Sequence, residues 1–174
     1  MPASFRPPLK ADKEKKKRTT SQSKASNMMQ DTGTVADLLA GKTGPVIAIS
    51  PEDTLSKAVA ILRDKRIGAL VVTDEAGKVA GILSERDIVR KLAETPGQTL
   101  PQSVTDNMTA PVVTCEASDS LVDVLRRMTE GRFRHMPVVE GEKPVGMVTI
   151  GDVVQYRLSE LEQETLQLKQ MIVG

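Results

Sequence analysis

Apolar residues along the chain follow two periods, one typical of short strands and one typical of helices. Six apolar runs have the length of strands, at 46–49, 69–73, 79–83, 112–114, 136–139 and 145–148. Two stretches repeat apolar residues at the i, i+3, i+4, i+7 spacing of a helix: Leu55, Ala58, Val59 and Leu62, then Leu121, Val124, Leu125 and Met128. Further helices are expected from residue 34 and over 85–93. This alternation predicts a fold of the α/β (α+β) class.

A serine or threonine followed three residues later by aspartate is the capping pattern of a helix start, and we take four such pairs in this chain as helix starts. The pairs are Thr34 with Asp37, Ser84 with Asp87, Ser103 with Asp106, and Thr149 with Asp152. In the pairs of Asp87 and Asp152, an apolar strand run leads into the turn and a glycine, Gly81 or Gly146, stands three residues before the hydroxyl. We assign the other two pairs to capping alone and treat these two aspartates as candidate ligand-binding residues.

The order of elements repeats once, at a nearly constant spacing. Asp53 and Asp119, which we expect to cap the two long helices, lie 66 residues apart, and Asp87 and Asp152 lie 65 apart. From helix start to final aspartate the separation is 34 residues in the first unit and 33 in the second. Two unrelated domains would not keep step so closely, so the chain contains an internal duplication.

The duplication divides the chain into five parts. The first repeat covers 34–95 and the second covers 103–157, with a Pro- and Gly-containing linker at 96–102 between them. A basic arm at 1–33 precedes the repeats, and an amphipathic helix at 158–174 follows them. The arm is rich in Pro, Lys, Ser and Thr and has no apolar period, so we expect it to be disordered.

Composition narrows the classes of function. The 174 residues include no Trp, one Tyr and two Phe, so the chain lacks the aromatic platforms on which single-stranded nucleic acids stack. A single histidine, His135, excludes a multi-histidine metal site, and no Walker loop or catalytic triad is present. The lone Cys115, interpreted as an inert core residue, cannot form an intrachain disulfide, and no apolar run approaches the roughly 18 residues of a membrane span. We expect a cytoplasmic protein that is not an enzyme and holds no metal.

The net charge of +1 hides an uneven distribution. The arm at 1–33 carries eight Lys or Arg against three acids, which leaves the remainder of the chain mildly acidic. A basic run can contact nucleic acid, membrane phosphates or an acidic partner, although it is more often a solvated face. We therefore expect nucleic acid to be at most a weak partner of this arm.

The C-terminal stretch carries the pattern of a coiled coil. Apolar or small residues alternate spacings of three and four, as an a/d seam does: Leu158, Leu161, Thr165, Leu168 and Ile172. Such a helix can pack back on its own domain or meet a symmetry mate. Because it runs about 15 residues past the last domain element, we expect a homodimer.

The duplicated pattern resembles a known family. The motif Gly-apolar-apolar-Ser/Thr-x-x-Asp at 81–87 and 146–152, with the apolar run at 67–72 before its first copy, is similar to the cystathionine β-synthase (CBS) domain. Two such domains in tandem resemble a Bateman module, and the resemblance covers about 34–157. The likeness is greatest to small stand-alone bacterial proteins that consist of one such pair.

The resemblance implies a fold and a class of ligand. In that family two tandem repeats pack their sheets around a pseudo-twofold axis and leave two clefts, to which this chain would add a C-terminal helical extension. The clefts bind adenosine-containing ligands, with AMP the first expectation here and NAD(H), ADP, ATP or S-adenosylmethionine the others. A bound adenine nucleotide would be sensed and its presence transmitted to an unknown protein partner.

The resemblance assigns the ribose hydroxyls to Asp87 and Asp152, with Ser84 and Thr149 assisting at the helix starts. A carboxylate can accept hydrogen bonds from both vicinal hydroxyls, and the positive end of the helix dipole keeps it ionised. The exposed backbone N–H groups of the same turn favour anions.

Residues just before the second strand of each repeat are implied to reach the phosphates. Arg134 and His135 occupy this place in the second repeat, opposite Gly68 and Ala69 in the first, so the two clefts are expected to differ. Without the resemblance, a lone histidine is more often a surface or half-buried hydrogen-bonding group. The other implied cleft positions, several of them lining the adenine slots, are Thr43, Val46, Ile47, Arg86, Pro111, Val112, Val113, Met136, Pro137 and Gly151.

Two other kinds of function stay open. The chain could be a ligand-free dimerisation or adaptor protein that acts through its basic N-terminal arm, but the first-turn aspartate present in both repeats argues against this. An enzyme is the weakest hypothesis. IMP dehydrogenase and cystathionine β-synthase carry such repeat pairs, yet this chain is too short to supply their catalytic barrel or cofactor domain.

Overall fold

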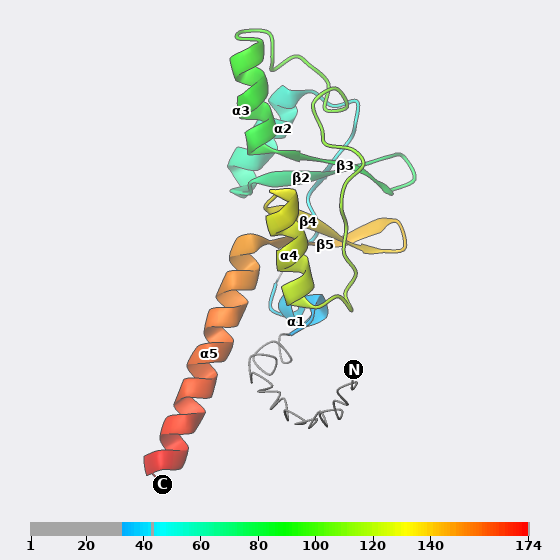
Figure 1. Ribbon diagram of the computed structural model, residues 1–174. Helices are drawn as coiled ribbons and strands as arrows, with labels where there is room; N and C mark the ends of the chain where they lie inside the picture. The colour runs from blue at the N-terminus through cyan, green and yellow to red at the C-terminus, as the bar shows by residue number, and fades with distance from the viewer. Residues whose placement is uncertain (1–32, 43, 174) are drawn as a thin grey trace, which may run out of the picture. The chain divides into compact units, whose positions relative to one another are not determined.

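The computed structural model describes residues 33–42 and 44–173, which form two β-sheets with helices around them (Figure 1). The mixed helix and strand fold expected from the apolar pattern is confirmed. The predictions made for residues 1–32 of the basic arm, and for Thr43, lie outside the described residues.

The first repeat builds a three-stranded sheet. Its elements are β1 (Ala48–Ile49), α2 (Leu55–Lys65), β2 (Ala69–Thr73), β3 (Val79–Ser84) and α3 (Glu85–Glu94). β2 lies in the middle of the sheet, parallel to β1 and antiparallel to β3. α2 buries Leu55, Ala58 and Leu62 in the core of this repeat, as their spacing predicts, whereas Val59 stays 38% exposed beside them.

The second repeat follows the same plan with a smaller sheet. Its elements are α4 (Leu121–Gly131), β4 (His135–Glu140), β5 (Lys143–Thr149) and α5 (Ile150–Val173). β4 and β5 pair antiparallel, and Cys115 makes one parallel bridge to Val138 where the first repeat has β1. The strand predicted at 112–114 is wrong, because the Thr114 carbonyl accepts a hydrogen bond from the Arg127 side chain at 3.0 Å and does not join the sheet.

Each repeat receives part of its core from the segment that leads into the other. α1 (Val35–Ala40) lies beside α4 in Figure 1, and it buries Val35 and Leu38 with Leu121 and Met128 of the second repeat. The α1 helix therefore belongs to the core of the second repeat, although the chain enters the first repeat directly after it.

The reverse exchange uses the turn at 103–108. Val104 is completely buried in the core of the first repeat, and its N–H donates to the Asp53 carbonyl at 2.8 Å. The equivalent bond in the other direction runs from the Val35 N–H to the Asp119 carbonyl at 2.9 Å. Because each leading segment completes the opposite core, neither repeat keeps its full core without the other.

The glycines of the two strand-to-helix junctions make room for the exchanged segments. A Cβ atom on Gly146 would lie 2.8 Å from a methyl carbon of Leu39 in α1. A Cβ atom on Gly81 would lie 2.6 Å from the Sδ of Met108 and 3.0 Å from the Thr109 carbonyl oxygen. Close packing therefore favours glycine at both positions, and more strictly at Gly81, where a backbone oxygen is one of the neighbours.

The long helices begin one residue later than predicted. Thr54, and not Asp53, is the N-cap of α2, because its hydroxyl accepts the Lys57 backbone N–H at 3.3 Å. Ser120 takes the same place on α4, so the prediction that Asp119 caps this helix is also wrong. Asp53 instead forms an ion pair with the Lys57 side chain at 2.8 Å.

Of the two pairs assigned to capping alone, only one caps a helix. Thr34 and Asp37 form a reciprocal capping box at the start of α1. Ser103 and Asp106 make the same backbone contact, with 3.3 Å between the Asp106 nitrogen and the serine Oγ, but a short turn follows instead of a helix.

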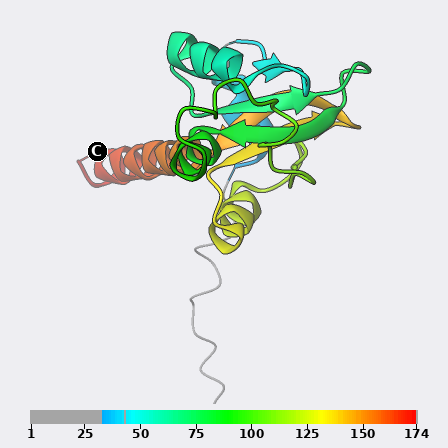
Figure 2. The same cartoon turned by 90° about the horizontal axis from the view of Figure 1, so that it is seen from above.

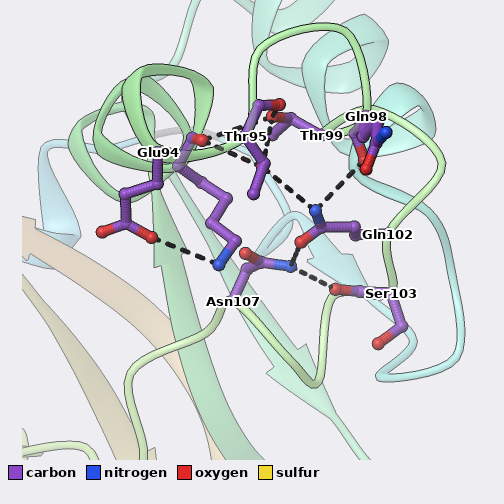
Figure 3. Close-up of polar contacts among 8 residues, drawn as sticks. Glu94, Thr95, Gln98, Thr99, Gln102, Ser103 and Asn107 are labelled. Atoms are coloured by element: carbon purple, nitrogen blue, oxygen red, sulfur yellow. Dashed lines mark hydrogen bonds and ion pairs between the residues drawn. The ribbon is translucent and has the colours of Figure 1, made fainter.

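The linker predicted at 96–102 is an ordered polar turn (Figure 3). Thr99 is 1% exposed, and its hydroxyl donates to the Thr95 carbonyl at 2.7 Å. The Gln102 side-chain oxygen accepts a hydrogen bond from the Asn107 amide at 3.3 Å. These bonds attach the end of α3 to the turn that carries Val104 into the first core.

α5 is one continuous helix of 24 residues, so the boundary expected after 157 does not interrupt it. Every residue from 161 to 172 is exposed. Figures 1 and 2 show this helix leading away from both sheets, which means that its last turns do not pack back on their own repeat.

Candidate functional site

Two clefts lie at the two strand-to-helix junctions. The cleft at the start of α3, hereafter the Asp87 cleft, encloses about 420 Å³. The cleft at the start of α5, hereafter the Asp152 cleft, encloses about 500 Å³. Both volumes fall within the range of pockets that take small organic ligands.

In the Asp87 cleft, the capping interaction occupies only one oxygen of the aspartate. The Ser84 backbone N–H and hydroxyl donate to Oδ2 of Asp87 at 2.9 and 2.6 Å. Its other oxygen, Oδ1, has no hydrogen-bond partner among the described residues. This oxygen can therefore accept hydrogen bonds from a ligand while the helix start stays capped.

In the Asp152 cleft, the equivalent aspartate has an additional partner. The Thr149 backbone N–H donates to Oδ2 of Asp152 at 2.8 Å, and the Lys42 ammonium donates to the same oxygen at 2.5 Å. Lys42 also donates to the Met147 carbonyl at 2.9 Å. Burial raises the pKa of Asp152, but the hydrogen bonds from Lys42 and Thr149 outweigh burial and hold this pKa below its ordinary value.

The two clefts carry unequal charge. The basic side chains that line the Asp87 cleft are Arg86, Arg90, Arg132, Arg134 and the half-buried His135. Only Glu85 and Asp87 oppose them in the lining of that cleft. The basic side chains that line the Asp152 cleft are Lys42, Arg66 and the same His135, and Lys42 is already paired with the aspartate. The Asp87 cleft is therefore the better anion site.

One arginine in each cleft has an unusual backbone conformation. Arg66 and Arg132 are the C-caps of α2 and α4, with φ of 53° and 57° in the left-handed region. Glycine is the residue that adopts this conformation without steric cost. Both arginines therefore adopt a conformation that glycine would adopt at lower cost, and each of them lines its cleft.

His135 lines both clefts. A Cβ atom on Gly68 would lie 3.1 Å from the Nε2 of His135, so the ring packs directly against the backbone of that glycine. Burial lowers the pKa of His135, while the carboxylates of Glu85 and Asp152, one from each cleft, act to raise it. Charged groups of both clefts therefore act on the pKa of this one side chain.

Most of the predicted site residues do meet at these clefts. Those that line the Asp87 cleft are Gly68, Ser84, Arg86, Asp87, Pro111, Val112, Val113, Arg134 and His135. Those that line the Asp152 cleft are Val46, Ile47, Gly68, Ala69, His135, Thr149 and Asp152. Each cleft thus combines the aspartate of one repeat with the segment before the first long helix of the other.

Three predicted positions line neither cleft. Met136 and Pro137 are both buried in β4, and His135 is the residue of this strand that lines the clefts. Gly151 is exposed in the first turn of α5. Thr43 lies outside the described residues.

Four basic residues that line the clefts are not among the site residues predicted from the sequence. Arg66 and Arg132 lie 66 positions apart, the spacing of the duplication, and comparing the two helix ends would have found them. Arg90 lies one helical turn after Arg86 and shares its face. Lys42 contacts Asp152, which lies 110 residues later in the sequence, and no local sequence pattern predicts that contact.

Within residues 33–42 and 44–173, no helix has the length and apolarity needed to cross a membrane. The same residues contain no group of three or more His, Cys, Asp or Glu side chains arranged to hold a metal ion.

The family model of the CBS domain matches residues 35–94 and 103–159. This chain belongs to the CBS-domain family. The two CBS repeats are those that the duplicated motif indicated, and the exchanged segments are the beginnings of the two matched regions.

The chain is 34% identical over 143 residues to the uncharacterized protein MJ1404 of Methanocaldococcus jannaschii, in a match that covers 75% of this chain. The match covers 33% of MJ1404, so the CBS pair spans a third of that relative. Among solved structures, the CBS-domain protein ATU1752 from Agrobacterium tumefaciens superposes with a TM-score of 0.70 at 40% identity, covering 74% of this chain and 96% of ATU1752.

Two solved CBS structures with bound ligands have the same fold as this CBS pair. CBSX2 in complex with AMP has a TM-score of 0.60 and 28% identity, over 72% of this chain and 96% of CBSX2. The CBS pair of MJ0100, in complex with 5′-methylthioadenosine and S-adenosyl-L-methionine, has a TM-score of 0.66 and 26% identity, over 75% of this chain and 99% of that pair.

Proposed function

We propose that this CBS pair is a regulatory, non-enzymatic module that binds an adenosine-containing ligand in its clefts and passes the bound state to a partner protein. The observation that carries the proposal is the pair of first-turn aspartates, Asp87 and Asp152, each in a cleft built by both repeats. AMP is the first ligand we propose, with ADP, ATP, NAD(H) and S-adenosylmethionine as competitors. Acting in the cytoplasm as a homodimer, the module would report energy state to its partner.

The ribose is proposed to bind through the aspartates. Oδ2 of Asp87 is held by Ser84, which fixes the direction of the carboxylate and leaves Oδ1 toward the ligand hydroxyls. The carboxylate accepts both vicinal hydroxyls as charge-assisted hydrogen bonds. In the Asp152 cleft Lys42 occupies the same carboxylate oxygen as Thr149, so a ligand there also meets an ammonium group.

The adenine ring is proposed to lie against the apolar wall opposite each aspartate. Val112 and Val113 supply that wall in the Asp87 cleft, and Val46 and Ile47 supply it in the Asp152 cleft. Val113 is 47% exposed, so covering it with a ring removes apolar surface from water.

The phosphates are proposed to bind where the charge is concentrated. Arg134 and His135 lie in the Asp87 cleft together with three further arginines, and this excess positive charge favours ligands with more than one phosphate. The Asp152 cleft, where Lys42 is already paired with Asp152, suits a ligand with less negative charge. The two clefts would therefore hold different ligands, or hold the same ligand with different affinities.

The ligands of the structural neighbours support this proposal. AMP in CBSX2, and 5′-methylthioadenosine with S-adenosyl-L-methionine in MJ0100, share an adenosine group and differ in what is attached to its 5′ carbon. The adenosine part is the part that the aspartate and the apolar wall would recognise. The 5′ part is the part that the unequal basic groups would discriminate.

The experiment that tests this function is a thermal-shift and calorimetric panel with AMP, ADP, ATP, NAD⁺, NADH and S-adenosylmethionine. A ligand at about 100 times its Kd should stabilise the fold by about 2.7 kcal/mol. Asp87→Asn and Asp152→Asn should each remove binding at one site. Asp37→Asn is the matched control, because this aspartate makes the same kind of capping box but lines neither cleft.

The panel also has outcomes that contradict the proposal. If no adenosine compound shifts the melting temperature, the sensor function fails, and the ligand-free adaptor acting through the basic arm becomes the better hypothesis. If shifts persist in both cleft variants, the ligand binds but the ribose assignment is wrong.

A further inference from the structure

α5 carries a largely apolar stripe whose residues are all exposed. The stripe, hereafter the α5 seam, consists of Val154, Leu158, Leu161, Thr165, Leu168 and Ile172. Leu168 is 57% exposed and Ile172 is 84% exposed. A helix that extends into water without packing is marginally stable, because tertiary contacts supply most helical stability. The seam therefore requires a partner.

The seam does not compete with the face of α5 that packs on the second repeat. That face is marked by Val153, which is 4% exposed in the core, and by Tyr156 packed against the same core. Val154 is already 46% exposed. At about 100° per residue, the seam is centred roughly a quarter turn away from Val153. A second helix can reach the seam while the first turns of α5 stay docked.

The charged residues beside the seam are complementary to a second copy of the same helix. With Leu158 and Thr165 at a positions, the flanking g positions hold Arg157 and Glu164, and the e positions that face them in a parallel pair hold Glu162 and Lys169. Both pairings, Arg157 with Glu162 and Glu164 with Lys169, join opposite charges. Within the described residues only Arg157 among these four forms an ion pair, with a neighbouring glutamate.

An antiparallel pair does not show this complementarity. Keeping all six layers in antiparallel order packs Leu161 against Thr165 and Leu158 against Leu168 of the second helix. That register brings Glu164 next to Glu164 of the copy, and Glu162 next to its own copy. Like charges at such flanking positions destabilise the pairing.

We infer that the α5 seam pairs with the α5 seam of a second copy as a parallel, in-register, two-stranded coiled coil. This inference rests on the homodimer of the proposed function and gives it a surface and a direction, and it does not depend on any ligand. A parallel coil brings the starts of both α5 helices to the same end. Because Asp152 lies in the first turn of α5, a change in that cleft acts directly on the base of the coil.

Cysteine cross-linking of the full chain tests the direction of the pair. In a parallel pair, Leu168→Cys meets its own copy in one d layer and forms a disulfide-linked dimer. In the antiparallel register the two introduced thiols are separated by about 10 residues, or roughly 15 Å, which is too far for a disulfide. The wild-type chain is the control, because its Cys115 is 2% exposed and we expect no cross-link through it.

Alanine variants test the surface. Leu161→Ala and Leu168→Ala each remove one apolar layer from both helices, and we expect each to raise the dimer Kd at least about tenfold in sedimentation equilibrium. Leu166→Ala is the matched control, since Leu166 is 58% exposed on the same helix but lies outside the seam. We expect it to leave the dimer Kd within about twofold of the wild type.

Charge variants test the pairing rule. Glu164→Lys puts two lysines side by side in a parallel pair and should weaken the dimer several-fold. Adding Lys169→Glu restores opposite charges and should return the Kd to near the wild-type value. In the antiparallel register the second change does not meet the first, and no rescue is expected.

Three results would overturn the inference. A monomer at about 100 µM chain concentration shows that the seam does not pair with itself. A dimer insensitive to Leu161→Ala and Leu168→Ala shows that copies associate elsewhere, which leaves the homodimer intact. Cross-linking between a Leu158→Cys chain and a Leu168→Cys chain, without self-linking of either, shows an antiparallel pair. None of these results bears on the ligand panel, so the failure of this inference and the failure of nucleotide sensing are distinguishable.

Discussion

At the scale of single residues, two aspartates with the same local geometry differ in what else reaches them. Among the described residues, the Asp87 side chain accepts hydrogen bonds only from Ser84. The Asp152 side chain accepts one from Thr149 and another, at 2.5 Å, from the ammonium group of Lys42. Capping is a local property that the spacing Ser/Thr-x-x-Asp specifies. The additional charge comes from a residue beyond α1, which reaches Asp152 only because α1 is part of the second core.

Removing Lys42 should move the acid limit of stability upward. The pKa of Asp152 lies below its ordinary value, so the carboxylate stabilises the fold above about pH 4 and this contribution is lost as the pH falls through the folded-state pKa. In Lys42→Met the hydrogen bond is lost while burial remains, and the loss should begin at higher pH. Melting temperatures from pH 3 to 7 measure this, with the exposed Lys143→Met as control. If the melting temperature of Lys42→Met falls at the same pH as that of the wild type, this prediction is wrong.

His135 should couple ligand binding to pH. Burial holds its pKa below the ordinary value, and Arg134 and Lys42 lower it further, against the carboxylates of Glu85 and Asp152. The fold therefore favours the neutral ring, and stability falls as the pH drops below about 6.5 toward the folded-state pKa.

An anionic ligand favours the protonated form of His135 and so raises the pKa of this residue. The affinity of the protein for the ligand should therefore rise as the pH falls from 7 to 5.5. His135→Gln should remove both the stability slope in this range and the pH dependence of binding. Calorimetric titration with AMP at each pH measures the second effect. A variant that keeps the wild-type pH dependence would assign it to another group.

Replacing an arginine in the left-handed conformation should lower ligand affinity without lowering the stability of the fold. Arg132→Gly relieves an L-residue with φ of 57°, so we expect the free energy of unfolding to stay within about 1 kcal/mol of the wild type. Ligand affinity in the Asp87 cleft should fall about tenfold, because one charged hydrogen bond is lost. Denaturant unfolding and titration with ATP measure the two effects. Arg126→Ala is the control, because Arg126 is exposed on α4 and lines neither cleft. An equal loss of ligand affinity in both variants would exclude a specific role for Arg132.

At the scale of elements, the segment that packs against each strand-to-helix junction determines how strictly glycine is needed there. Gly81 faces both a side chain and a backbone carbonyl of the segment at 103–109, while Gly146 faces only the flexible end of Leu39. The sequence identified both glycines as part of one motif. Only the packing of the exchanged segments explains why the two positions differ in tolerance.

Gly81→Ala should be the more damaging of the two substitutions. Its Cβ would meet the Thr109 carbonyl oxygen at 3.0 Å, and we expect a loss of about 1–3 kcal/mol in the free energy of unfolding. Gly146→Ala should cost less, since Leu39 can change rotamer. Gly151→Ala is the control, because a Cβ there would lie 3.7 Å from its nearest neighbour, the Thr149 hydroxyl oxygen, and we expect no loss in the free energy of unfolding. Urea unfolding measures all three, and equal losses would show that packing at Gly81 is not limiting.

The elements themselves were largely predictable. The strand at β2 and the helices α2 to α4 follow from apolar period and capping residues, because both act within a few residues of each other. The missing strand at 112–114 could not be foreseen, since it depends on the Arg127 side chain taking the Thr114 carbonyl. The apolar Val112 and Val113 then line a cleft instead of a sheet.

At the scale of the whole molecule, the exchange of leading segments makes the CBS pair one folding unit. Val35 and Val104 are each completely buried in the core of the opposite repeat. Opening one repeat therefore removes part of the core of the other. The same exchange brings the residues before each first long helix opposite the aspartate of the other repeat, so it also creates the clefts.

The two repeats should unfold in a single transition. Val104→Ala and Val35→Ala should each destabilise the protein by about 2 kcal/mol, through the cavity left in a core. In both variants the calorimetric and van't Hoff enthalpies should agree, as they do for one cooperative unit. Differential scanning calorimetry at low protein concentration measures this. Two separated transitions, with only one moved by each variant, would show independent repeats.

By itself the sequence determined the features that depend on neighbours along the chain: the duplication, the strand and helix order, and the first-turn aspartates Asp87 and Asp152. Only the tertiary structure decided the features that join distant residues. These are the exchanged cores, the Lys42 contact to Asp152 across 110 residues, and the position of His135 in both clefts. The physical reason is that capping and apolar period act over one or two helical turns, whereas the charge of a cleft is the sum over whichever side chains the packed cores bring together.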